Sequence, residues 1–426
     1  MTYGKTLSYL LTCFVASLPL VSPLAAEEPP AENWTQWRGP ERDGLLPETA
    51  WPKTLDESTL RSLWRVEFGP SYSGPIVTKD QVFTTETKDE EVEIVRALDR
   101  ATGEQLWQTE WAGAMTVPFF AAANGSWIRA TPVLDGNLLY VAGMRDVLVC
   151  LDARTGVEIW KVDFVEELET PLPSFGCASS PLIHGDHVYI QAAASVVKLE
   201  KKTGKVVWRA MKDGGGMSGS AFSSPIVATI AGQPQLVVQG RTTLAGIDLE
   251  SGEVLWSQEI PAFRGMNIVT PTVVDDTVFT SSYGGSSLLF SVTAADDESL
   301  QVEEVWKNRT QGYMSSPIVI DGHVFLHLRN QRFTCIELAT GETKWTTTPF
   351  GKYWSMVASG SQILALDERG ELLLIRANPE EFDLIDRRKI SEESTWAYLA
   401  VSGDDLFIRE LGALQAFRWK DSGEDD

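Results

Sequence analysis

The chain has 426 residues, a formal net charge of −23, 43% hydrophobic residues and 10% aromatic residues. This composition is that of a globular protein with enough apolar side chains for a large core. The acidic balance argues against a nucleic-acid partner, because binding to phosphates requires a basic surface, and such a charge commonly keeps an exported protein soluble.

The first 26 residues have the pattern of a secretory signal peptide. Lys5 is the only charge before Glu27, an apolar run covers residues 7–21, and small residues up to Ala26 offer a cleavage site. The run is too short for a membrane span. We therefore expect a periplasmic or extracellular protein whose mature chain has no transmembrane segment. A lipoprotein anchored at Cys13 is the less favoured alternative, because Thr12 stands where a small residue is expected.

Residues 27–61 follow as an N-terminal spacer or arm, acidic and rich in proline at its start. Beyond it, one tryptophan phrase recurs. It has the form Ala-x-Asp-x-x-Thr-Gly-x-x-x-Trp in residues 97–107, and close variants occupy 150–160, 198–208, 246–256 and 335–345. The tryptophans in this series are Trp64, Trp107, Trp160, Trp208, Trp256, Trp306 and Trp345. A repeat of roughly 40–50 residues built from short strands predicts a β-propeller.

A second phrase, with Ser or Thr before Pro in most copies, precedes each tryptophan phrase and predicts the first strand of each unit. The third unit is expected to have strands at 178–183, 187–191, 196–200 and 205–211. Its third and fourth strands are joined by a turn at 201–204, where Gly204 accepts a left-handed backbone. One blade is therefore a four-stranded antiparallel sheet whose tryptophan packs against a neighbouring blade.

Counting these phrases predicts eight blades within residues 62–420, followed by an acidic tail at 421–426. The eighth unit lacks a fourth strand, and residues 63–68 form a fourth strand with no blade before it. The N-terminal strand should therefore complete the last blade and close the ring, which removes open sheet edges. The seventh unit departs from the pattern, with Ile390 or a neighbour where the tryptophan is expected.

After cleavage, three cysteines remain, at 150, 177 and 335. Cys150 and Cys335 occupy the same position four repeats apart, too far for a disulfide, so we expect unpaired buried thiols. His184 and His187 flank a turn and are expected to be solvated rather than to bind a metal.

The tryptophan phrase resembles the pyrroloquinoline quinone (PQQ) repeat, which occurs in eight-bladed quinoprotein dehydrogenases and in cofactor-free relatives. One such relative is the propeller lipoprotein of the outer-membrane β-barrel assembly machinery. The resemblance covers residues 63–419, and the opening phrase at residues 37–44 resembles the start of exported single-propeller members. The resemblance to the PQQ repeat implies an eight-bladed propeller.

The resemblance implies dehydrogenase activity only if the residues that bind the quinone and its cation are present. A quinoprotein would need a Ca²⁺ site, an Asp base and commonly an adjacent cysteine pair, and the sequence has no such pair. Asp99, Asp152 and Asp248 belong to the repeated turn, which favours a structural role. No catalytic, cofactor-binding or metal-binding residue is assigned. The sequence favours a cofactor-free, non-enzymatic protein. The alternative is a dehydrogenase of alcohols or sugars using PQQ with Ca²⁺, and a propeller hydrolase or lyase is a third possibility.

The face that carries the loops between blades is the candidate binding face. Two of its loops are long, at 110–128 and 163–176. Unusual residues just before the first strands complete the face: Arg129, Asn267, Tyr313, Trp354 and Trp396. Aromatic and arginine side chains are typical of binding hot spots, although the same residues could simply plug the channel. We expect a monomeric binding or scaffolding module that presents this face to an envelope protein or a glycan.

Overall fold

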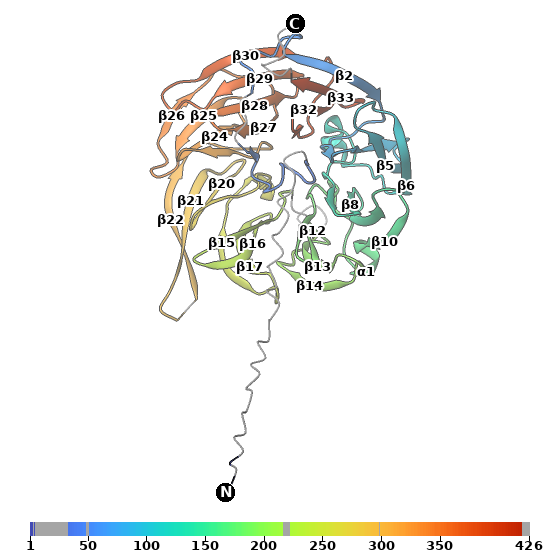
Figure 1. Cartoon of the computed structure of the whole chain (residues 1–426). Helices are drawn as coiled ribbons and strands as arrows, with labels where there is room; N and C mark the ends of the chain where they lie inside the picture. The colour runs from blue at the N-terminus through green and yellow to red at the C-terminus, as the bar shows by residue number, and fades with distance from the viewer. Residues whose placement is uncertain (3, 5–32, 48–50, 216–221, 298, 420–426) are drawn as a thin grey trace. The chain divides into compact units, whose positions relative to one another are not determined.

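The computed structural model describes residues 1, 2, 4, 33–47, 51–215, 222–297 and 299–419. Nearly all of the expected signal peptide, the start of the spacer and the tail at 421–426 lie outside the described residues. Residues 31–426 form one compact unit. Its strands are arranged as eight sheets around a central opening, which confirms the expected eight-bladed propeller (Figure 1).

Each blade is a four-stranded antiparallel sheet whose strands run from the central opening outward in chain order, except that the outermost strand of blade 8 is β2. Blade 1 contains β3 (Ile76–Val77), β4 (Gln81–Lys88), β5 (Val92–Asp99) and β6 (Gln105–Ala112). Blade 2 contains β7 (Val133–Asp135), β8 (Leu138–Gly143), β9 (Val147–Asp152) and β10 (Glu158–Asp163). Blade 3 contains β11 (Leu182–His184), β12 (His187–Ala192), β13 (Ser195–Glu200) and β14 (Val206–Ala210). Blade 4 contains β15 (Ile226–Ile230), β16 (Gln233–Gln239), β17 (Thr243–Asp248) and β18 (Val254–Glu259).

The second half of the ring repeats this plan. Blade 5 contains β19 (Thr272–Val274), β20 (Thr277–Ser281), β21 (Ser287–Ala294) and β22 (Leu300–Asn308). Blade 6 contains β23 (Ile318–Ile320), β24 (His323–His327), β25 (Phe333–Glu337) and β26 (Thr343–Thr346). Blade 7 contains β27 (Trp354–Ser359), β28 (Gln362–Asp367), β29 (Glu371–Arg376) and β30 (Asp383–Lys389). Blade 8 contains β31 (Ala400–Ser402), β32 (Asp405–Arg409), β33 (Ala413–Trp419) and β2 (Leu60–Glu67).

Blade 8 is completed by the N-terminal strand, as predicted. Strand β2 pairs antiparallel with β33, from Leu60 opposite Trp419 to Glu67 opposite Ala413. Two segments far apart in the sequence therefore form one sheet, so that the ring closes without an open edge between its first and last blades.

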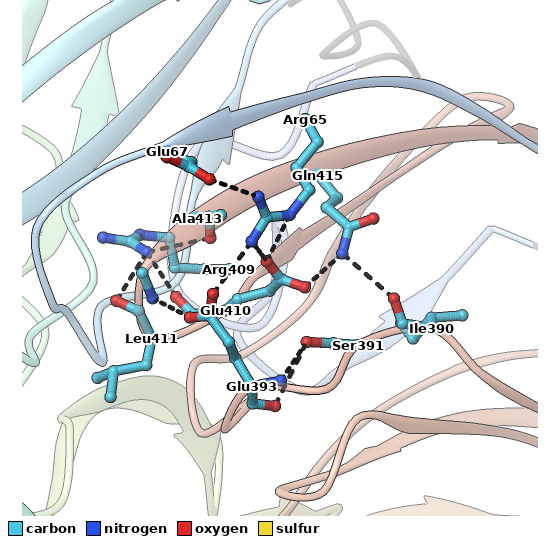
Figure 2. Close-up of polar contacts among 11 residues, drawn as sticks. Arg65, Glu67, Ile390, Ser391, Glu393, Arg409, Glu410, Leu411, Ala413 and Gln415 are labelled. Atoms are coloured by element: carbon cyan, nitrogen blue, oxygen red, sulfur yellow. Dashed lines mark hydrogen bonds and ion pairs between the residues drawn. The ribbon is translucent and has the colours of Figure 1, made fainter.

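Charged side chains reinforce this closure (Figure 2). Arg65 of β2 lies 2.7 Å from the buried Glu410 and 3.1 Å from Glu393. Arg409 is fully buried and donates to the carbonyl of Ala413 within blade 8 at 3.0 Å and to that of Gly69, next to blade 1, at 2.6 Å. Burial lowers the pKa of Arg409 to about 10. Ion pairs and backbone pairing thus complete blade 8, and Arg409 links that blade to the segment that leads into blade 1.

The repeated tryptophan and the repeated Thr-Gly turn fit together between blades. The indole N–H of Trp107 donates to the carbonyl of Ala153 in the turn of blade 2, at 3.0 Å. Gly156 of that turn has a positive φ, and a Cβ there would lie only 2.4 Å from the same indole. Equivalent pairs of a tryptophan with the next blade's turn are Trp64–Gly103, Trp160–Gly204, Trp208–Gly252 and Trp306–Gly341. The phrase therefore encodes an inter-blade contact.

Blade 7 departs from this plan in a way that corrects the sequence-based alignment. The residue that occupies the tryptophan position, opposite Leu374 at the strand bulge, is Asp386 and not Ile390 or an immediate neighbour. The Asp386 carboxylate accepts from the backbone N–H of Leu55 at 2.6 Å. Trp51 and Leu55 are buried in the core cluster shared with blades 7 and 8. Because strand β30 is short of apolar residues, the periodic pattern gave no register there.

The N-terminal arm is part of the folded body. Trp34 pairs with Val77 in blade 1, with hydrogen bonds of 2.8 and 2.7 Å. The carbonyl of Thr35 accepts from Leu134 in blade 2. Further along, β1 (Leu45–Leu46) pairs in parallel with β27 of blade 7. In Figure 1 the arm is the blue segment over the central opening.

Two buried arginines of the arm contact two separate blades of the ring. Arg42 donates to the carbonyls of Pro181 and Ser180 in blade 3, at 2.8 and 3.0 Å. Arg38 donates to the carbonyl of Pro317 in blade 6. Burial lowers the pKa of both guanidinium groups, that of Arg42 to about 9. The arm thus bridges the central opening through hydrogen bonds to carbonyls just before the inner strands of blades 3 and 6.

Candidate functional site

A cavity of about 480 Å³ lies at the mouth of the channel, on the side of the inter-blade loops. Its wall is formed by the loop after β6, with the 3₁₀ helix η1 (Phe119–Asn124), and by the loop after β10, which begins with α1 (Phe164–Glu167). The 3₁₀ helix η2 (Phe263–Gly265) completes the wall. Trp37 of the arm also lines the cavity. A volume of this size is typical of sites for small molecules.

A ring of hydroxyl groups lies at the inner ends of the blades. The backbone N–H of Ser180 in blade 3 donates to the hydroxyl of Ser224 in blade 4 at 3.0 Å. The last bond of the series runs from the backbone N–H of Ser316, in blade 6, to the hydroxyl of Tyr398, which precedes the first strand of blade 8. The intermediate bonds join Gly74 to Thr131, Thr131 to Ser180, Ser224 to Thr270, and Thr270 to Ser316. The Ser/Thr-Pro phrase thus links successive blades.

This ring also corrects the expected extent of the first strands. In the third blade the first strand was expected at 178–183, whereas β11 covers only Leu182–His184. Of the residues before it, Ser180 uses its N–H and its hydroxyl for contacts between blades, and the Ser179 hydroxyl accepts from the backbone N–H of Gln191 within blade 3. A proline at 181 cannot donate to a sheet ladder, so pairing begins only after it.

Aromatic side chains surround the cavity in two arcs. One arc joins Tyr72, Trp396, Tyr353, Tyr313 and Tyr283, with centroid separations of 4.6, 4.2, 6.1 and 5.1 Å in that order. It continues to Phe263 at 5.2 Å. The second arc joins Phe120, Phe175 and Phe222. Such chains of rings give a rigid apolar wall.

Arginines lie beside both arcs. The Arg241 guanidinium sits 5.0 Å over the ring of Phe222 and donates to the carbonyl of Arg264 at 2.7 Å. The Arg264 guanidinium lies 5.2 Å over the ring of Phe263. On the other side, Arg129 donates to the carbonyls of Trp127 and Gly125. Burial lowers the pKa of Arg129 to about 10.

Three of the five candidate residues from the sequence meet in this cavity: Arg129, Tyr313 and Trp396 all line it. Asn267 and Trp354 are buried outside its lining. The Asn267 amide donates to the carbonyls of Arg241 and Ile260, and Trp354 stacks on His327 at 4.9 Å. Their immediate neighbours line the cavity or join its arc, because successive side chains of an extended segment point to opposite sides.

The sequence interpretation missed most of the aromatic wall. Phe120, Phe175, Phe222 and Phe263 come from inter-blade loops, where no periodic pattern marks a residue as facing a cavity. Trp37 comes from the arm, far from the loops in sequence. Long loops rich in phenylalanine were the available signal. Phe119 and Phe120 are exposed by 91% and 52%, which is unusual for phenylalanine.

A buried carboxyl group lies behind this wall. Glu93 accepts hydrogen bonds from the backbone N–H of Met144 at 2.8 Å and from the indole of Trp111 at 2.9 Å. Burial raises the pKa of Glu93 to about 8. Its partners belong to blade 1 and the neighbouring blade 2, so it joins these blades and does not line the cavity.

The cavity does not fit PQQ with Ca²⁺. Calcium requires several oxygen ligands, most of them carboxylates, whereas the charged residues that line the cavity in the described part of the chain are arginines. No group of three or more His, Cys, Asp or Glu suited to a metal occurs among the described residues. Asp99, as predicted, accepts from the backbone N–H groups of Ala101 and Thr102 in its own turn.

The structure also tests two further expectations, that the cysteines are unpaired and that no helix crosses a membrane. Cys150, Cys177 and Cys335 are buried and unpaired, in agreement with the expected free thiols. Burial raises the pKa of each thiol, to about 12 for Cys150 and Cys335. Within the described ranges, no helix has the length and apolar character needed to cross a bilayer.

The fold and its repeats define an eight-bladed propeller of the PQQ-repeat class. The family model described as outer membrane protein assembly factor BamB matches residues 91–347. The chain belongs to this family.

Individual relatives agree with this assignment. The BamB protein of Yersinia pestis is 26% identical over 384 residues, which cover 86% of this chain and 91% of that protein. The crystal structure of BamB from Moraxella catarrhalis has a TM-score of 0.61 at 15% identity and covers 86% of this chain and 99% of that one. A europium-containing methanol dehydrogenase gives 0.52 at 11% identity, covering 91% and 98%. The two structural likenesses show a shared fold.

Proposed function

We propose that this protein is an exported, non-enzymatic scaffold of the cell envelope that assists outer-membrane protein assembly. It holds a protein partner on the face of the inter-blade loops. Membership of the family of outer membrane protein assembly factor BamB supports this role. In this proposal the protein is a periplasmic monomer that begins after Ala26. Sequencing of the mature N-terminus tests this start, and a lipid-modified N-terminus at Cys13 would contradict it.

The exposed phenylalanines beside the cavity are the observation that most supports this face as the partner-binding surface. Phe119 is 91% exposed and contacts Phe120 edge to face at 5.6 Å. Exposed aromatic residues that surround a concave surface are the usual anchors of a protein interface. The hydrogen-bonded ring of hydroxyls and the inter-blade tryptophans hold the loops on a rigid frame, which lowers the entropy lost on binding.

Recovery of partners from envelope extracts tests the proposal. The tagged protein is compared with Arg129→Ala and Trp396→Ala, and with Val254→Ala as a control on the exposed outer strand β18. We expect both cavity variants to lose an outer-membrane assembly partner that the wild type and the control retain. Thermal unfolding of each variant confirms that it is folded. Equal recovery of all partners by every variant would contradict the proposed face.

The quinoprotein alternative has its own test. Addition of PQQ with Ca²⁺ is followed by measurement of dye-linked oxidation of alcohols and sugars. We expect no turnover, because arginines stand where a divalent cation would need carboxylates. Stoichiometric binding of the quinone with turnover would establish a dehydrogenase instead.

A further inference from the structure

The cavity at the channel mouth has a charge opposite to that of the whole chain. The net charge is −23, yet the charged side chains that line the cavity in the described part of the chain are Arg129, Arg241 and Arg264. A concave site with low-dielectric walls focuses the field of the charges that line it. The site therefore attracts an anion from solution despite the acidic surface elsewhere.

Two of these guanidinium groups have donors left for a ligand. Arg129 uses Nε and Nη2 for loop carbonyls at 3.2 and 3.1 Å, and no described residue accepts from its Nη1. The Arg264 side chain makes no hydrogen bond or ion pair with a described residue and is exposed at the rim. Burial lowers the pKa of Arg129 to about 10. An anion at this group would replace the solvation that burial removes.

Hydroxyl groups add further donors to the cavity lining. Thr131, Ser180, Ser224 and Thr270 line the cavity. Each hydroxyl oxygen accepts a backbone N–H from the preceding blade, and no described residue accepts the hydroxyl hydrogen in return. A hydroxyl that accepts one bond can still donate one. The polar part of the lining is thus rich in donors, which matches a ligand made of acceptors.

The rest of the lining is aromatic. Phe222 and Phe263 lie under the guanidinium groups of Arg241 and Arg264, and Tyr313 and Trp396 continue the wall. These rings offer faces and edges to a flat apolar group. The volume of about 480 Å³ is that of a site for a small molecule and not for a folded domain.

We propose that this cavity is a binding site for a small aromatic acid. Its carboxylate takes the open donors of Arg129, Arg264 and the hydroxyl groups, and its ring packs among the aromatic side chains. This site shares its face with the proposed protein partner but involves a different ligand, so the two proposals fail separately.

Calorimetric titration of the full mature protein tests the proposal. The probe is N-acetyl-phenylalanine, compared with its neutral amide and with the neutral sugar diacetylchitobiose. We expect one saturable site for the acid, an affinity at least about tenfold lower for the amide, and weakening by salt. Arg129→Gln and Arg264→Gln should each lower the affinity for the acid about tenfold. Arg61→Gln, on the exposed part of β2, is the matched control and should leave affinity unchanged.

Each other outcome overturns the proposal. Equal binding of acid and amide would remove the anion requirement, and tighter binding of the sugar would make the cavity a glycan site. Unchanged affinity in Arg264→Gln would also contradict it, because this exposed substitution leaves the fold intact. Absence of heat at millimolar probe would contradict the site itself, while partner recovery from envelope extracts would still test the scaffold role.

Discussion

The indole of Trp64 and the backbone of Gly103 meet where the first and last blades join. The Trp64 Nε1–H donates to the carbonyl of Arg100 at 2.9 Å, in the turn that ends with Gly103. A Cβ on Gly103 would lie 2.8 Å from the indole ring. Trp64 belongs to the N-terminal strand β2 and Gly103 to blade 1. The contact that joins Trp107, Trp160, Trp208 and Trp306 to the turn of the next blade therefore also joins the two ends of the ring.

A methyl group at Gly103 tests this contact. Gly103→Ala should lower the free energy of unfolding by about 1–3 kcal/mol more than Gly136→Ala, measured by urea denaturation. Both glycines have a positive φ, at 73° and 57°, so both variants carry a similar backbone strain. A Cβ at Gly136 meets no atom within 4 Å. Equal losses in the two variants would show that the inter-blade contact is unimportant.

The ring of hydroxyl groups leads to a second prediction, at Ser224. Ser224→Ala removes the acceptor of the buried Ser180 N–H and should cost about 1–3 kcal/mol of unfolding free energy. Ser224→Thr keeps the hydroxyl, as Thr131 and Thr270 do at equivalent positions, and should cost less than about 1 kcal/mol. Chemical denaturation of both variants measures the difference. A threonine variant as unstable as the alanine variant would argue against the hydrogen bond.

Closure of blade 8 depends on Arg65. Arg65→Ala leaves Glu410, which is 2% exposed, without its nearest cation and should lower the unfolding free energy by about 1–3 kcal/mol. The expected loss is modest because the Arg65 side chain is 38% exposed and its charge is screened by solvent. Arg61→Ala in the same strand should change stability by less than about 0.5 kcal/mol. Thermal and urea unfolding give both values, and similar losses would mean that the ion pairs do not hold the seam.

His327 makes stability depend on pH. Burial lowers the pKa of His327 from 6.5 to about 3, so the folded protein keeps this imidazole neutral. The unfolded chain takes up a proton below pH 6.5 and therefore binds more protons than the folded protein. Stability attributable to this residue is complete above pH 6.5 and falls as pH is lowered toward 3, by about 1.4 kcal/mol per pH unit.

A variant that cannot titrate isolates this effect. His327→Phe keeps an aromatic ring beside Trp354 and should flatten the decline of unfolding free energy between pH 6.5 and pH 4.5, by about 2–3 kcal/mol. The exposed His184→Gln should leave the profile unchanged. Urea denaturation at several pH values provides the comparison. A profile in His327→Phe that matches the wild type would mean that His327 titrates normally in the folded protein.

The repeat made the fold predictable, because inter-blade contacts recur at the same spacing. The sequence alone places Trp64, Trp107 and Gly156 in the ring, and it also places the closing strand. The register of the outer strand of blade 7 was not predictable, because Asp386 replaces the tryptophan there. Trp51 of the arm instead supplies apolar volume to the core cluster that contains Leu374. Such compensation between distant segments leaves no local pattern.

The cavity was predictable only in part, for a geometric reason. Arg129, Tyr313 and Trp396 precede first strands, whose position the repeat fixes. Asn267 and Trp354 are buried, because in their extended segments it is the neighbouring residue whose side chain faces the cavity side. Sequence spacing in an irregular segment does not determine which of two successive side chains faces the cavity. The phenylalanines of the long loops come together through loop conformation alone.

Site-specific photocrosslinking in living cells tests the central claim most directly. A photoreactive phenylalanine analogue is placed at Phe119, on the exposed rim of the cavity, and at Val254, on the exposed outer strand of blade 4. The scaffold account predicts that the Phe119 position crosslinks to an outer-membrane assembly protein and that the Val254 position does not. Crosslinks to that protein from Val254 alone, or no crosslink from either position, would contradict it.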